Sequence, residues 1–299
     1  MNSTTPSPPE STVVVLGDVL IDEMRTPTES IDVPGGSALN VAVGLAVLGI
    51  RPLLVGMVGD DASGALIRAH VHAHDVPLLS TPAPLGTGRA ISDRAAGEPR
   101  YSFSQASRSR SLVPTSEARQ AIGRADVVVI SGFPFDDASE VATLQELLRP
   151  GAKVMIDANP RSGLLHERAA FADGLLTIAP RADLVKMGEE DAELVFSASL
   201  PETTALILDA GARAVLETMG SGGAAIVTPT DRVTVPITTA AGPVIDTMGA
   251  GDATFATVVA SLATSGDRVP EAPEVMLSRA MAVAAATVRS PGGLLRLPE

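Results

Sequence analysis

The chain lacks cysteine and tryptophan and contains few aromatic residues. Without cysteine there is no disulfide framework, no thiolate metal site and no cysteine nucleophile. Aromatic residues make up 2% of the 299 residues, which argues against platforms for stacking nucleic-acid bases. The net charge of −13 supports the same exclusion, because phosphate backbones bind basic surfaces. We therefore expect no nucleic-acid partner.

Lysine occurs only at Lys153 and Lys186, and neither residue follows a glycine. A P-loop requires a lysine directly after a glycine, so a Walker-type nucleotide site is excluded. The sequence has no uninterrupted apolar run of about eighteen residues, and we expect no membrane span. Residues 1–12 have neither a basic start nor an apolar run. We predict a disordered tail there rather than a signal peptide, and a cytoplasmic protein.

Hydrophobic residues make up 45% of the chain and charged residues 19%, which suffices for a sizeable core. Short apolar runs, such as 13–16 and 127–130, alternate with helical patterns, such as 116–124 and 138–148. This alternation predicts βαβ units with right-handed crossovers and a mainly parallel sheet. We assign residues 13–299 to a single domain of this α/β class.

The segment from about residue 82 to 110 has a different character. Gly, Pro, Ser and Arg interrupt short runs there, such as Arg89–Ile91 and Tyr101–Phe103. The turn-like Gly97-Glu98-Pro99 lies between the two runs, which predicts a hairpin in a small antiparallel flap. Such a flap suits a lid that excludes water from a site.

The most informative stretch runs from Val244 to Phe255. Val244-Ile245 is interpreted as the end of a strand, and helical spacing predicts a helix that begins at or just before Asp252. The small residues Gly249-Ala250-Gly251 let backbone N–H groups approach a ligand, and a helix start favours an anion. A carboxylate in the same place suggests a base that accepts a proton while a phosphate passes.

Three other polar residues follow predicted strands or lie in an apolar helix. Asp22 and Arg161 come after strands, where open α/β sheets bind ligands, although both are also compatible with solvent-exposed loops. Asn40 lies one turn into an apolar helix after Gly35-Gly36, and either sugar hydroxyls or neighbouring backbone would satisfy its amide. The acids at 189–191 either complement a helix dipole or surround Mg²⁺.

Two separated motifs resemble those of ribokinase-like sugar kinases, also called the phosphofructokinase-B type. Asp246-Thr247-Met248-Gly249-Ala250-Gly251-Asp252 is similar to the C-terminal signature Asp-Thr-x-Gly-Ala-Gly-Asp. Gly35-Gly36 through Asn40, continued by Ala42 to Leu48-Gly49, is similar to the N-terminal signature. The two motifs occur in the family's order, and the similarity covers the chain from about Val13 to Gly293.

The resemblance implies a three-layer α/β/α fold with a central, mainly parallel sheet and a small β lid built from segments near 17–34 and 82–110. It implies transfer of the γ-phosphate of ATP to a hydroxyl of a small sugar, with Mg²⁺ and a monovalent cation such as K⁺ as cofactors. Among the members of the family, fructokinases and 2-keto-3-deoxygluconate kinases have the most similar motifs. The expected substrate is therefore fructose or a similar ketose or keto-sugar acid. Ribokinase or nucleoside kinase activity and a non-catalytic sugar sensor are the alternatives. Dimerisation through the lid is a further implication.

The resemblance also implies roles for individual residues. The catalytic set comprises Asp252 as general base and the anion hole of Gly249, Ala250 and Gly251. The sugar-binding set comprises Asp22, Gly35, Gly36, Asn40 and Arg161. The ATP-binding set comprises Lys186, Thr218, Gly220, Gly223, Thr247, Gly249 and Gly251. The metal-binding set comprises Glu190, Asp191 and Asp246. Glu190 and Asp191 lie in a segment where Gly188 replaces the asparagine often found in the family, and Asp246 either orients the turn or bridges to the metal.

Overall fold

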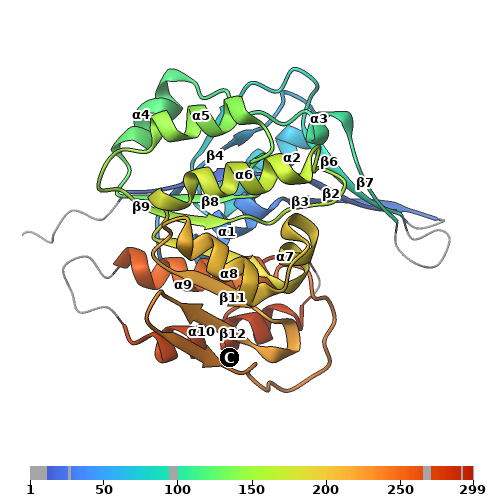
Figure 1. Ribbon diagram of the computed structural model, residues 1–299. Coiled ribbons are helices and arrows are strands. Elements are labelled where there is room, and N and C mark those ends of the chain that lie inside the picture. Colours follow the sequence, from blue (N-terminus) through green and yellow to red (C-terminus); the bar gives the residue numbers. More distant parts are fainter. Residues whose placement is uncertain (1–11, 26–27, 94–99, 265–270, 291, 299) are drawn as a thin grey trace, which may run out of the picture.

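A nine-stranded sheet with helices on both faces forms the body of the molecule (Figure 1). The computed structural model describes residues 12–25, 28–93, 100–264, 271–290 and 292–298. The tail predicted at 1–12, apart from Thr12, and the turn predicted at Gly97-Glu98-Pro99 lie outside these residues. In spatial order the strands are β13 (Arg232–Val235), β12 (Ala224–Val227), β11 (Val215–Thr218), β10 (Leu184–Gly188), β9 (Lys153–Asp157), β8 (Val127–Ser131), β1 (Val13–Gly17), β4 (Pro52–Met57) and β5 (Leu78–Thr81).

The predicted mainly parallel sheet is confirmed. From β11 to β5 every neighbouring pair is parallel, and only β12 and β13 join in antiparallel orientation. Successive residues of a strand face opposite sides of the sheet. Val13 and Val15 therefore enter one hydrophobic core, whereas Val14 and Leu16 enter the other.

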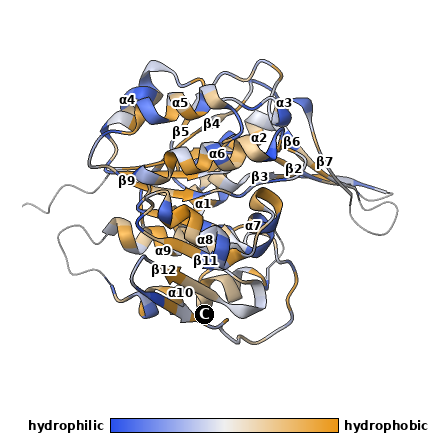
Figure 2. Ribbon diagram, in the orientation of Figure 1, coloured by the Kyte–Doolittle hydropathy of each residue, from blue (hydrophilic) through white to orange (hydrophobic). Residues whose placement is uncertain are grey.

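Each face of the sheet is covered by its own layer of helices, as the predicted three-layer fold requires. One core includes residues of α1 (Ser37–Val47), α2 (Ala62–Ala73), α9 (Ala250–Thr264) and α10 (Pro273–Thr287). The other includes residues of α4 (Ser116–Arg124), α5 (Ala138–Leu147), α6 (Arg168–Ile178), α7 (Glu189–Phe196) and α8 (Leu200–Asp209). Figure 2 shows hydrophobic residues along the central strands and mostly hydrophilic residues on α4. No helix of the described residues is both long and apolar enough to cross a membrane.

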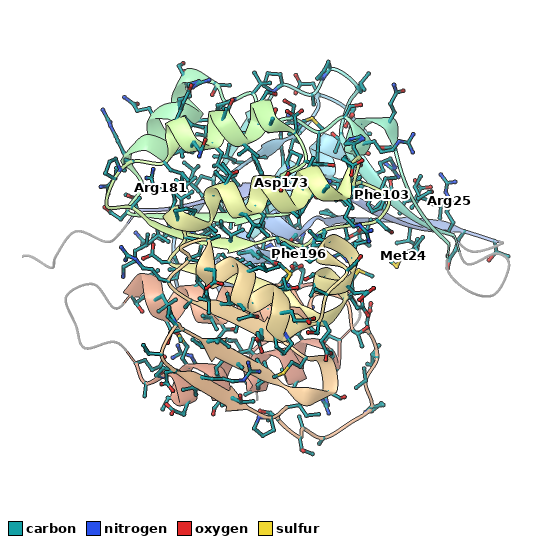
Figure 3. The ribbon with its side chains drawn as sticks, in the orientation of Figure 1. Met24, Arg25, Phe103, Asp173, Arg181 and Phe196 are labelled. Carbon is teal, nitrogen blue, oxygen red and sulfur yellow. The ribbon has the colours of Figure 1, made fainter. Side chains whose placement is uncertain are left out.

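A second, four-stranded sheet projects from one side of the body (Figure 1). Its order is β3 (Ser30–Gly35), β2 (Leu20–Arg25), β6 (Gly88–Asp93) and β7 (Arg100–Phe103), and the short α3 (Gln105–Arg108) follows. β6 and β7 pair in the predicted antiparallel manner, whereas β2 and β6 are parallel. Met24 and Arg25 lie on the outer part of this sheet (Figure 3).

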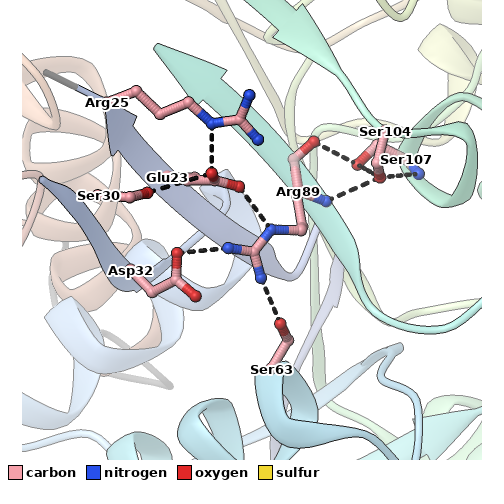
Figure 4. Close-up of polar contacts among 8 residues, drawn as sticks. All are labelled: Glu23, Arg25, Ser30, Asp32, Ser63, Arg89, Ser104 and Ser107. Carbon is pink, nitrogen blue, oxygen red and sulfur yellow. Dashed lines mark hydrogen bonds and ion pairs between the residues drawn. The ribbon is translucent and has the colours of Figure 1, made fainter. Parts of the chain in front are cut away.

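A charged network ties this second sheet to the body (Figure 4). Arg89 Nε donates to Glu23 Oε2 at 2.9 Å, and Arg89 Nη1 donates to Ser63 Oγ on α2 at 2.6 Å. Arg89 also pairs with Asp32 of β3. Hydrogen bonds from Arg25 and then from Arg89 hold the pKa of Glu23 at about 2, although burial opposes them. Charge-assisted bonds of this kind fix the orientation of the sheet relative to α2.

The prediction of a strand end at Val244-Ile245 is wrong. The two residues are 58% and 57% exposed, and the Ile245 N–H donates to the Val288 carbonyl at 2.8 Å instead of to a neighbouring strand. β13, the last strand among the described residues, ends just before Pro236, and Gly242-Pro243 interrupts the chain again. Proline lacks the N–H that a sheet requires, so the segment crosses to the site as a loop.

Gly17→Ala tests the close approach at the end of β1. Gly17 has a φ of +142°, and an added Cβ would lie 1.8 Å from the Ser131 carbonyl oxygen. We expect a loss of at least about 1–3 kcal/mol in the free energy of unfolding, measured by urea denaturation. Gly123→Ala is the matched control, because a Cβ there meets nothing within 4 Å and lies in α4. Gly123→Ala should raise the free energy of unfolding by about 0.5–1 kcal/mol, because alanine favours a helix more than glycine does. Equal free energies of unfolding for the two variants would contradict the close approach at Gly17.

Candidate active site

Two adjoining cavities lie at the carboxyl ends of the parallel strands. The first has a volume of about 320 Å³ and is lined by Asp18, Leu20, Asp22, Gly36, Ser37, Asn40, Ala90, Phe103, Asn159, Arg161, Ser162, Leu164, Met248, Gly249 and Asp252. The second, of about 560 Å³, is lined by Asn159, Arg161, Lys186, Gly188, Glu189, Glu190, Asp191, Thr218, Gly220, Asp246, Thr247, Met248, Gly249, Gly251 and Asp252. Asp252 lines both cavities and therefore lies on the wall between them.

Two hydrogen bonds hold the Asp252 carboxylate in place. Asp252 lies in the first turn of α9 and is 9% exposed. Ser37 Oγ donates to Oδ1 at 3.0 Å, and Asn40 Nδ2 donates to Oδ2 at 2.9 Å. The Ser37 hydroxyl also bonds to the hydroxyl of Ser131, at the end of β8. Asn40, whose amide was expected to bind either a sugar or backbone, thus lines the first cavity while it bonds to a carboxylate.

The turn before α9 is held by Asp246. Its Oδ1 accepts from the Met248 N–H at 2.9 Å, and its Oδ2 accepts from the Gly292 N–H at 3.2 Å. Gly249 has a φ of +78°, and an added Cβ would lie 2.1 Å from the Gly293 carbonyl oxygen. A glycine is therefore required there. Gly249 lines both cavities and Gly251 lines the second, so the start of α9 faces them with the positive end that favours an anion. Ala250 lines neither cavity, and its N–H donates to the Thr247 carbonyl at 3.4 Å.

A buried cation lies beside this helix start. Lys186 Nζ donates to Asp157 Oδ1 at 2.9 Å and lies 3.9 Å from Asp191 Oδ2. A Cβ on Gly251 would lie 3.4 Å from Nζ, which places the ammonium group next to the first turn of α9. Burial alone would lower the pKa of Lys186, but the two carboxylates raise it above its usual value. Burial raises the pKa of Asp157 to about 6 against the effect of Lys186.

Asp22 brings a second carboxyl group to the first cavity. A Cβ on Gly35 would lie 2.0 Å from Asp22 Oδ2, so the glycine leaves room for this side chain. Burial raises the pKa of Asp22 to about 6, the Arg161 guanidinium opposes the rise, and the charge of Asp252 adds to it. Arg161 lines both cavities, at the place expected from the end of β9.

The three residues expected to bind metal all line the second cavity. Among the described residues, no group of three or more His, Asp and Glu side chains is arranged to hold an ion. Both carboxylate oxygens of Asp246 accept backbone hydrogen bonds. One oxygen of Asp191, Oδ2, accepts from the Gly188 N–H at 3.0 Å. Mg²⁺ is commonly held by one or two carboxylates together with substrate phosphates. Glu190 and Asp191 fit that donor set.

The structure brings most of the remaining expected residues together. Thr218, Gly220 and Thr247 line the second cavity. Gly223 lies outside both cavities, because it forms the turn into β12, where an added Cβ would lie 2.1 Å from the Val235 carbonyl oxygen. Ala250 opens α9.

Four residues that the sequence did not single out also belong to the site. Ser37 and Ser131 support Asp252, Asp18 lines the first cavity, and Asn159 lines both. Asn159 precedes a proline and has a φ of +38°. An Asn-Pro pair after a strand was an available sequence signal, because asparagine tolerates this conformation. The two serines carried no comparable signal.

Comparisons with known proteins agree with this geometry. A family model described as "pfkB family carbohydrate kinase" matches residues 13–299. A fructokinase from Klebsiella pneumoniae is 30% identical over 309 aligned residues, which cover 95% of each chain. An ATP-dependent 6-phosphofructokinase from Thermoanaerobacterium thermosaccharolyticum is 24% identical over 64% of this chain and 61% of that protein. The crystal structure of a fructokinase with bound ATP from Xylella fastidiosa superposes with a TM-score of 0.81, at 24% identity over 95% of this chain and 94% of that one.

Asp22→Asn tests the burial of this carboxyl group through the pH dependence of stability. The pKa rises from 3.8 to about 6 on folding, so the native state binds the proton more tightly. This contribution is complete below the unfolded pKa and is lost as the pH rises through about 6. As the pH rises from about 4 to 7, the free energy of unfolding of the variant should therefore increase by up to about 3 kcal/mol relative to that of wild type, measured by urea denaturation.

The exposed Asp209 at the end of α8 gives a matched control, Asp209→Asn. It makes the same carboxyl-to-amide change outside both cavities, and the pH dependence of Asp22→Asn is compared with it. A stability difference between Asp22→Asn and wild type that stays constant from about pH 4 to 7 would contradict the raised pKa of Asp22.

Proposed function

The chain belongs to the pfkB family of carbohydrate kinases, which transfer phosphate to an alcohol group, and we propose that its acceptor is fructose or a similar ketose or keto-sugar acid, with Asp252 as the general base. The position of Asp252 on the wall shared by the two cavities is the strongest support for this role. A sugar in the first cavity and ATP in the second would meet at this carboxylate. The Klebsiella fructokinase, 30% identical over nearly the whole chain, supports the choice of sugar.

In the proposed reaction a sugar hydroxyl oxygen forms a bond to the γ-phosphorus, the bond from that phosphorus to the β-phosphate oxygen breaks, and ADP leaves. Asp252 accepts the hydroxyl proton. Ser37 and Asn40 orient its carboxylate, because each donates a hydrogen bond to one of its oxygens. The transition state of such transfers is loose, so positioning and electrostatics supply most of the catalysis.

The start of α9 and Lys186 would stabilise the charge on the moving phosphoryl group. The N–H groups of Gly249, Ala250 and Gly251 lie at the positive end of a helix, which favours anions. Lys186 adds a buried positive charge beside Gly251. Preorganised donors of this kind act strongly because they need no rearrangement during the reaction.

Mg²⁺ would enter with ATP and neutralise phosphate charge. Glu190 and Asp191 are the residues proposed to hold it, because both line the second cavity and hard cations prefer oxygen ligands. Thr218 and Gly220, at the end of β11, line the part of the cavity proposed for the rest of the nucleotide. A monovalent cation such as K⁺ stays a prediction.

Asp252→Asn tests the general base. The substitution keeps the size of the side chain and removes its ability to take the proton. Turnover should fall by about 10²–10⁴-fold while the affinity for sugar changes little, measured by coupled ADP release and calorimetry. Asp209→Asn should keep wild-type turnover. Turnover of Asp252→Asn within a few-fold of wild type would refute the role, and sugar binding without ADP release in the wild-type protein would identify a sensor.

Glu190→Gln tests the metal assignment. Chelation of Mg²⁺ should abolish turnover, and the variant should need about tenfold more Mg²⁺ for half-maximal rate, because one charged ligand is lost. Glu193→Gln changes an exposed residue of the same helix and provides the control. A Mg²⁺ titration of Glu190→Gln identical to that of the control would exclude this carboxylate as a ligand.

A further inference from the structure

An ion pair closes the side of the first cavity that lies away from the second. Asp18 follows β1 and Arg110 follows α3, and Arg110 Nη1 lies 3.4 Å from Asp18 Oδ2. The two side chains are 13% and 11% exposed. Asp18 and Leu20 also line a small third cavity of about 40 Å³, which includes Arg110, Ser107, Ser111 and Thr81. Asp18 thus lies between the first cavity and this third one, as Asp252 lies between the first and the second.

The Arg110 guanidinium has unused hydrogen-bonding capacity. Its Nε and Nη1 are buried and have no hydrogen-bond partner, and the contact of 3.4 Å with Asp18 is an ion pair rather than a hydrogen bond. The Thr81 hydroxyl in the same cavity is also buried without a partner. Buried donors without acceptors are costly, so they indicate a place where a polar ligand or water completes the structure.

Asp18 is held firmly at this place. Its backbone N–H donates to the Ser131 carbonyl at 3.1 Å, and its own carbonyl accepts from the Ala38 N–H at 3.1 Å. A Cβ on Gly132 would lie 2.8 Å from Asp18 Oδ2, so the carboxylate packs directly on this glycine. A rigid carboxylate beside a guanidinium with unpaired donors is suited to selective recognition.

We infer that a hydroxyl group at the end of the sugar remote from the transferred phosphate enters the third cavity, which both Asp18 and Arg110 line. There it bonds to both side chains, which thereby select neutral sugars over sugar acids and sugar phosphates. The inference rests on the proposed function and narrows its substrate class. A hydroxyl both donates to Asp18 and accepts from Arg110, whereas a carboxylate or phosphate only accepts. A charged group in that position would compete with Asp18 for the same guanidinium.

The charges of the first cavity favour the same selection. Its charged lining consists of the carboxylates of Asp18, Asp22 and Asp252 and the guanidinium of Arg161. Arg110 lies behind Asp18, and Arg161 lies on the wall shared with the second cavity, beside the ATP phosphates in the proposed complex. An anionic group on the sugar would therefore meet more negative than positive charge. Like charges at close range discriminate strongly between ligands.

The test compares fructose, 2-keto-3-deoxygluconate and fructose 6-phosphate as substrates of the wild-type protein by coupled ADP release. We expect kcat/KM for fructose to exceed those for the two anionic sugars by about 100-fold or more. Equal or greater kcat/KM for either anionic sugar would overturn the inference and leave the kinase function intact. Calorimetry of the same sugars without ATP separates binding from chemistry. Preferential binding of fructose without any ADP release would refute the proposed function and support the selection.

Two variants test the residues themselves. Asp18→Asn should lower kcat/KM for fructose by about 10–100-fold and narrow the preference for fructose over the sugar acid by at least about tenfold. Arg110→Gln should lower kcat/KM for fructose by about tenfold or more without improving the use of the sugar acid. Asp209→Asn and Arg119→Gln, which remove the same charges at exposed positions of α8 and α4, are the matched controls.

An unchanged sugar preference in folded Asp18→Asn, with a wild-type circular dichroism spectrum and melting temperature, would overturn the inference. If Asp18→Asn does not fold, Arg110→Gln and the wild-type panel decide. Wild-type values of kcat/KM for fructose in folded Arg110→Gln would remove Arg110 from the subsite and overturn the inference as stated.

Discussion

The carboxylate of Asp252 at the positive end of α9 is the constraint on which the rest of the site depends. A nearly buried charge is costly unless hydrogen bonds compensate it. Ser37 and Asn40 supply those bonds from α1, and Ser131 supports Ser37 from β8. These residues fix α1 and α9 relative to each other and to the strand ends. The same geometry places a carboxylate next to the positive end of a helix, a combination that suits the proposed phosphoryl transfer.

Two ion pairs lie near this centre, and each pair has a different task. Lys186 is kept charged by Asp157 and Asp191, and it brings a cation to the start of α9. Asp18 lies on the opposite wall of the first cavity, and Arg110 lies behind it with buried donors that have no partner. A buried pair of this kind contributes little net stability, because desolvation offsets attraction. The role of each pair here is to orient polar groups toward the cavities.

Several parts of the fold and site were predictable because they depend on local pattern. Alternating apolar runs and helical spacing predict βαβ units, since burial on a sheet or a helix has its own period. Glycines next to Asp252 predict a turn and a helix start, since close backbone approach excludes side chains. The same local reasoning was wrong for Val244-Ile245, which have an apolar pattern but cannot pair beyond Pro236. Gly223, which the resemblance assigns to ATP, lines neither cavity and forms the turn into β12.

By itself the sequence determined the three-layer α/β class, the family, and the identity of Asp252 and Asn40 as members of one site. These follow from short-range periodicity and from two motifs. Only the tertiary structure brought Asp18 beside Arg110 and Ser131 beside Ser37, because these residues are far apart in the chain and meet through parallel crossovers. Parallel strands all end at one edge of the sheet, and the loops beyond them converge there. Their contacts depend on the order of the strands, which local patterns do not specify.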